Sequence, residues 1–213
     1  MGSTASYCWI QNSGFTPDLL KKKLEPVKEQ AENVEDDLMT GLSAVLPPDL
    51  LQQLQAMYEA ERQEAASLRS PSLAYRRDTP WLPYFEMRLC DGSIADSRAA
   101  KKLSRQFGAP VLVMALFDSD ILFLSYADAA GSTVCDYAKP NFEEMEEYDT
   151  DLYSTEFPEI LLRLFANTDA AAVRDIWDGE EAFANDRLEK LCQLLGLPLL
   201  GEGCPMPEGF EIL

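Results

Sequence analysis

Two apolar segments separated by only three residues constrain the fold more than any other feature. Residues 111–117 (VLVMALF) and 121–126 (ILFLSY) are apolar almost throughout, and Asp118-Ser119-Asp120 lies between them. Short apolar runs bounded by turn-forming residues are typical of β-strands, and Asp and Ser favour tight turns through local hydrogen bonds to the backbone. The sequence therefore predicts a β-hairpin whose strands are central in a sheet that is covered on both faces.

The rest of the chain supplies further strands and amphipathic helices. We expect strands at residues 5–11, 82–89 and 132–137, a loop over residues 68–81, and an edge strand at the tail, residues 210–213. Helices are predicted at residues 16–23, 93–107, 155–165, from Asp169 onward, and at 180–195 with Phe183 facing inward. The predicted fold class is α+β: one domain over residues 1–213, with a mainly antiparallel sheet of about five strands and flanking helices.

A helical insert is expected at about residues 25–70. Apolar residues recur at steps of three and four from Val27 to Val45, Pro47 and Pro48 end that pattern, and a second amphipathic helix runs from Asp49 to Ser67. The two helices would form a hairpin whose apolar stripes belong to the core. The alternative is that this hairpin is the interface of an assembly or scaffold subunit; the sequence does not indicate the oligomeric state.

The composition excludes several classes of chemistry. The chain has no histidine, which excludes imidazole catalysis and histidine metal ligands. Its five cysteines are scattered without a C-x-x-C pair, which favours a reducing cytoplasm and neither a disulfide framework nor a thiolate metal site. No apolar run is long enough to cross a membrane, and the N-terminus does not resemble a secretory signal. We expect a cytoplasmic protein with no cofactor.

Charge is distributed unevenly along the chain. The formal net charge is -19; residues 1–110 hold 13 bases and 15 acids, whereas residues 111–213 hold 5 bases and 22 acids. Such a surplus argues against nucleic-acid binding, which needs a cationic face. It favours a basic protein partner, because a negative surface attracts such a partner and speeds its association.

The densest acidic segment is residues 143–151, with six acids in nine positions and aromatic residues interleaved. We expect partner binding here, by Glu143, Glu144, Glu146, Glu147, Tyr148, Asp149 and Asp151. The alternative is a solvated acidic loop that only aids solubility.

Two further groups of charged residues admit a second interpretation. Asp118 and Asp120 form a D-x-D pattern that could hold a divalent metal against a phosphorylated or sugar substrate, although a tight turn explains them more simply. Arg98, Lys101, Lys102 and Arg105 lie along one predicted helix face, where an anion could dock or where the helix is merely exposed.

Two segments carry a resemblance to known proteins: residues 102–112 (KLSRQFGAPVL) leading into residues 117–122, and residues 183–191 (FANDRLEKL) with residues 194–197. Together they resemble a family of uncharacterised bacterial cytoplasmic proteins, some of which look like immunity proteins of toxin systems. The resemblance covers about a third of the chain and brings no activity with it. The expected function is a non-enzymatic, acidic, immunity-like binding protein; the alternative is the metal-dependent enzyme.

Overall fold

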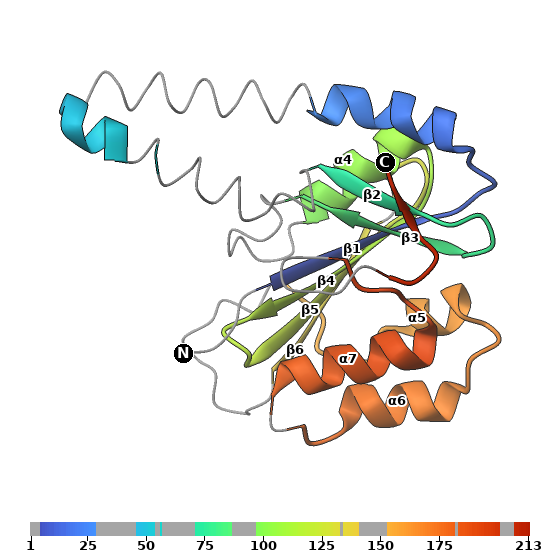
Figure 1. The fold of residues 1–213 in the computed structure, drawn as a ribbon. Coiled ribbons are helices and arrows are strands. Elements are labelled where there is room, and N and C mark those ends of the chain that lie inside the picture. The colour runs from blue at the N-terminus through green and yellow to red at the C-terminus, as the bar shows by residue number, and fades with distance from the viewer. Residues whose placement is uncertain are drawn as a thin grey trace.

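The fold is a single twisted sheet between two layers of helices (Figure 1). The computed structural model describes residues 5–28, 46–53, 56, 71–86, 97–132, 134–140, 153–181, 183–200 and 207–213. The seven strands in these residues lie in the order β6-β5-β4-β1-β3-β2-β7, and every pair of neighbours is antiparallel. Their bounds are β1 Ala5–Gln11, β2 Ser72–Tyr75, β3 Trp81–Phe85, β4 Val111–Phe117, β5 Ile121–Ala127, β6 Val134–Pro140 and β7 Glu211–Ile212. The α+β class and the antiparallel sheet are confirmed.

The predicted central hairpin is β4 and β5. The two strands pair in register from Val111 opposite Ala127 to Phe117 opposite Ile121, and each has a further strand on its other side, β1 beside β4 and β6 beside β5. Side chains alternate between the two faces of a strand, so an almost wholly apolar strand supplies both faces with core residues. This is why both strands are buried along nearly their whole length.

The alternation divides the interior into two cores. On one face, Val113 and Phe123 pack with Leu20, Leu24 and Leu103 from the helices above them. On the other face, Leu112, Met114 and Leu124 pack with a second set of helical residues, which includes Trp177 and Leu188.

A different group of helices covers each face. The first face carries the helix at residues 17–28 and α4 (Ser97–Phe107), and the second carries α5 (Glu159–Leu164), α6 (Ala170–Asp178) and α7 (Ala184–Leu195) (Figure 1). We call the first group the basic layer and the second the acidic layer, after the charge that is in excess in each. The chain thus places its N-terminal and C-terminal helices on opposite sides of one sheet.

Three expectations about strands were wrong. In the described residues the sheet has seven strands and not five, because Ser72–Tyr75 lies within the predicted loop 68–81 and pairs with both β3 and β7. This strand has only four residues, too few for a clear alternation. Strand β6 runs to Pro140, opposite Ile121, three residues beyond the predicted end; proline is tolerated because β6 is at the edge of the sheet. The tail does return as an edge strand, β7.

Other differences concern helix boundaries. The first helix does not end at residue 23 but continues through Pro26 to residue 28, because Leu20, Leu24 and Val27 form one continuous buried stripe. Helix α7 begins at Ala184, so Phe183 precedes it in an extended conformation and is 56% exposed, contrary to its predicted inward position. Most of the expected insert, residues 29–45, 54–55 and 57–70, lies outside the described residues.

Candidate functional site

Asp118 and Asp120 lie in the turn between β4 and β5. Asp118 and Ser119 have φ values of 51° and 63°, and the Asp120 amide donates to the Phe117 carbonyl oxygen at 3.0 Å. Positive φ at two successive residues defines the tight hairpin turn that matches strand twist, and Asp tolerates it well. The turn interpretation is confirmed. Within the described part of the chain, no group of three or more His, Cys, Asp or Glu residues is placed to hold a metal ion.

The acidic segment predicted to bind a partner lies outside the described residues. Glu143, Glu144, Glu146, Glu147, Tyr148, Asp149 and Asp151 are all within residues 141–152. Their role therefore stays a prediction from the sequence.

A second concentration of acids lies on α6, α7 and the residues that connect them. Four carboxylates are exposed there, and no ion pair joins any of them to a described residue: Asp175, Glu180, Asp186 and Glu189. We call these four the acidic face. Asp175 lies on α6, Glu180 lies in the connection, and Asp186 and Glu189 lie on α7. The two helices pack side by side on the second face of the sheet (Figure 1), and all four side chains are exposed on the solvent side of this layer.

The helix ends are fixed by their own sequence. The Asp169 carboxylate accepts a hydrogen bond at 2.9 Å from the Ala171 amide and so caps α6, as predicted. Helix α7 ends at Leu195, the predicted last residue, and Gly196 follows it in the left-handed conformation with φ 66°. The backbone amide of Ala184 donates to the Ser119 carbonyl oxygen at 2.8 Å, so the start of α7 is held against the β4–β5 turn.

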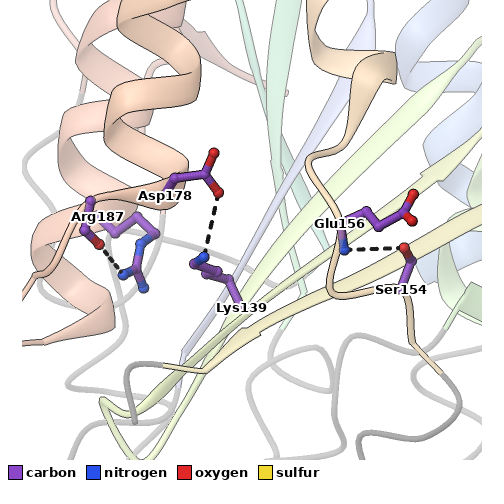
Figure 2. A network of polar contacts seen from close by, with 6 residues as sticks. Lys139, Ser154, Glu156, Asp178 and Arg187 are labelled. Carbon is purple, nitrogen blue, oxygen red and sulfur yellow. Dashed lines mark hydrogen bonds and ion pairs between the residues drawn. The ribbon is translucent and has the colours of Figure 1, made fainter. Parts of the chain in front are cut away.

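A buried cation holds the connection between α6 and α7. Arg187 is 1% exposed, and its guanidinium donates to the Gly179 carbonyl oxygen at 2.9 Å. Burial lowers the pKa of Arg187, and the carboxylates of Glu181 and Asp178 act in the opposite direction. Figure 2 shows Arg187 beside Asp178, and Asp178 in turn paired with Lys139 of β6 at 3.5 Å. These contacts tie the helix connection to the sheet.

Three other acids of this layer, Asp178, Glu159 and Glu181, have ion-pair partners. Glu181 pairs with Lys190 at 2.7 Å, and Glu159 pairs with Arg174, whose guanidinium also lies over the Phe157 ring at 4.2 Å. Ser154 accepts a hydrogen bond from the Glu156 amide at 3.3 Å (Figure 2). The backbone of Ser154 also bonds to β6, which covers part of that strand's outer edge. The contrast with these partnered acids is what sets the acidic face apart.

An exposed aromatic residue lies next to the acidic face. Phe183 lies between Glu180 and Asp186 in the sequence, and Leu19, Leu50 and Phe183 are the large apolar side chains that are exposed in the described residues. Sequence reasoning missed this site because Phe183 fits a helical apolar stripe. The acids of residues 175–189, spaced among apolar core positions, were the signal that could have revealed it.

The four cations predicted on one face of α4 line a common groove, and one of them, Arg105, binds the protein's own backbone. Arg105 donates to the carbonyl oxygens of Ala130 and Gly131, at 3.4 and 3.3 Å, and so docks the β5–β6 turn onto α4. Lys101 and Lys102 have no ion-pair partner among the described residues. A groove of about 460 Å³ lies along this helix face.

Comparison with known proteins gives no family for this chain: no protein-family model, no curated protein and no solved structure matches it. Among the described residues, no helix has both the length and the apolar character needed to span a membrane.

Proposed function

We propose that this chain is a non-enzymatic binding protein that docks a basic protein on its acidic face. The observation that carries the proposal is a set of four exposed carboxylates on α6, α7 and their connection, without ion-pair partners among the described residues and with the exposed Phe183 between Glu180 and Asp186 in the sequence. Unpaired carboxylates repel one another, and a cationic partner relieves that repulsion. An aromatic side chain at the same place supplies the apolar anchor that interface energetics favour.

The position of the protein's own cations supports the same conclusion. The cations of α4 lie in the basic layer, on the opposite face of the sheet from the acidic face (Figure 1). In the acidic layer itself, Arg174 and Lys190 pair with Glu159 and Glu181, so no ion pair among the described residues occupies the acidic face. The resemblance to immunity proteins points to a basic toxin as the class of partner that this protein neutralises.

The test compares two variants with the same net charge. The face variant carries Asp175→Asn, Glu180→Gln, Asp186→Asn and Glu189→Gln, and the control variant carries Glu25→Gln, Asp78→Asn, Glu208→Gln and Glu211→Gln, four exposed acids on other elements. Wild type and both variants are immobilised and exposed to an extract of the source cells, and retained proteins are quantified by mass spectrometry. We expect a Lys- and Arg-rich protein that wild type and control retain and the face variant loses.

The purified partner then gives the affinity. We expect the face variant to bind about tenfold more weakly or worse, since exposed charge pairs contribute up to about 1 kcal/mol each. The affinity of wild type should fall as NaCl rises, because salt screens exposed charges. An affinity that is indifferent to salt, or reduced equally in both variants, would contradict the proposal. A third variant with Gln at Glu143, Glu144, Glu146 and Glu147 shows whether the 143–151 segment contributes to the same binding.

A further inference from the structure

The basic layer contains a groove with a charge opposite to that of the molecule as a whole. Its floor is formed by Val27 and Leu103, which are 5% and 3% exposed, and its walls by Arg98, Lys101, Lys102 and Arg105. We call this the basic groove. Its volume of about 460 Å³ lies in the range of small-molecule sites.

Reciprocal contacts between two helices hold the shape of the groove. The Lys23 ammonium donates to the Gln106 carbonyl oxygen at 3.3 Å, and the Gln106 side-chain amide donates to the Lys23 carbonyl oxygen at 3.0 Å. Arg105 is fixed against the 130–131 turn by its two hydrogen bonds. The two helices and the Arg105 side chain are therefore positioned before any ligand arrives, which lowers the entropic cost of binding.

The two helices that line the groove carry more basic than acidic residues. Helix α4 contains no acid, and the helix at residues 17–28 contains four lysines and only two acids, Asp18 and Glu25. No ion pair joins Lys101 or Lys102 to a described residue. The net charge of -19 does not cancel this field locally, because the Debye length at physiological salt is about 8 Å and the acidic face lies beyond the sheet.

We propose that the basic groove binds a small ligand carrying two or more linked phosphates. From Arg98 to Arg105 the helix rises about 10 Å, which is longer than one phosphate and suits a short polyphosphate chain. Lys101 and Lys102 supply two neighbouring point charges for phosphate oxygens between the two arginines, and Arg105 donates to the turn through Nε and Nη2 only, which leaves Nη1 for a further phosphate contact. The groove's volume of about 460 Å³ suits a small ligand, whereas a nucleic-acid chain would extend well beyond it.

The test uses tripolyphosphate as the probe, with calorimetry on the full chain. The groove variant carries Lys101→Gln and Lys102→Gln, and the matched control carries Lys21→Gln and Lys22→Gln, two exposed lysines of the neighbouring helix that do not line the groove. We expect wild type and control to bind within about twofold of each other, and the groove variant to bind at least about tenfold more weakly. Thermal unfolding of each variant shows whether it is folded.

Two further probes make the result specific. Inorganic phosphate should bind at least about tenfold more weakly than tripolyphosphate, since it reaches fewer cations. A glutamate oligopeptide should bind more weakly as well; if it binds more tightly than tripolyphosphate, the groove takes an acidic peptide and the proposal is wrong. Absence of tripolyphosphate binding, or an equal loss in both lysine variants, also overturns it. None of the substituted residues belongs to the acidic face, so the outcome is independent of the proposed function.

Discussion

The two helical layers bury the same kind of surface and expose opposite charges. Helix 17–28 and α4 together hold eight bases and two acids, whereas residues 153–200, which contain α5 to α7, hold four bases and nine acids. Both layers place an apolar stripe on the same sheet, with Leu20, Leu24 and Leu103 on one face and Val173, Leu188 and Leu191 on the other. Burial therefore fixes both layers, and it leaves their outer charge free to serve binding.

The two layers also differ in how they are anchored. The acidic layer contains a buried cation, Arg187, which holds the helix connection among carboxylates. The basic layer is anchored by a surface arginine, Arg105, which reaches the carbonyl oxygens of a strand turn. Substitutions in each layer should therefore differ in their cost, and the largest effect is expected at the buried cation.

Replacing that cation should destabilise the acidic layer most. We expect Arg187→Met to lower the free energy of unfolding by about 3 kcal/mol, because Asp178 and Glu181 lose a buried cationic neighbour and the Gly179 carbonyl oxygen loses its donor. Urea denaturation measures this. Arg174→Met, which removes an exposed cation of the same layer, should cost no more than about 1 kcal/mol. Equal costs for the two variants would show that Arg187 has no special role.

Alanine substitution at two glycines with nearly the same φ measures how tightly each layer is packed at that position. At Gly131, a Cβ would lie 2.9 Å from the Lys101 carbonyl oxygen and from two atoms of the Arg105 side chain, whereas at Gly196 no atom lies within 4 Å. We expect Gly131→Ala to cost about 3 kcal/mol and Gly196→Ala about 1 kcal/mol, the latter from the left-handed backbone alone. Thermal unfolding of both variants checks the order. A smaller cost at Gly131 would mean that α4 is not packed tightly against the β5–β6 turn.

The acidic face should oppose folding slightly when no partner is present. The face variant is expected to gain about 1 kcal/mol in free energy of unfolding at low salt, since it removes like-charge repulsion. The control variant, with the same net charge, should gain less because its acids are dispersed. Added salt should remove the difference. If the control gained as much, the four carboxylates would not form a cluster.

The smallest effect on stability is expected at the exposed aromatic residue. Phe183→Ser should change the free energy of unfolding by less than about 0.5 kcal/mol, because the side chain is 56% exposed. It should weaken binding of the basic partner about fivefold or more. Leu19→Ser is the control, since Leu19 is 43% exposed on the basic layer. A loss of affinity in the Leu19 variant but not in the Phe183 variant would place the interface on the basic layer instead.

The sequence predicted the centre of the fold better than its edges. The β4–β5 hairpin, the start of α6 after Asp169 and the end of α7 at residue 195 follow from local chemistry, and all are present. Strand β2 was missed because four residues depend on pairing with β3 and β7, which no local pattern reveals. The first helix continues through Pro26, although proline disfavours a helix interior, because Leu24 and Val27 are buried against the sheet.

The candidate site was only partly predictable. The acidity of the second half is a property of composition, but its division into partnered and unpartnered carboxylates depends on tertiary contacts such as Lys190 with Glu181. The exposure of Phe183 depends on a helix boundary that differs by a few residues from the predicted one. The four cations of α4 were visible from spacing, whereas the groove beside them requires the neighbouring helix.

The central claim is that the sheet separates two binding surfaces. Backbone amide NMR of the labelled protein tests this claim most directly. The protein is titrated with a lysine oligopeptide and, in a separate sample, with tripolyphosphate. We predict that, among the described residues, the peptide shifts amides of α6 and α7 and tripolyphosphate shifts amides of α4 and of the helix at residues 17–28. Shifts from the peptide spread evenly over exposed acids of every element, or both probes acting on the same helices, would contradict it.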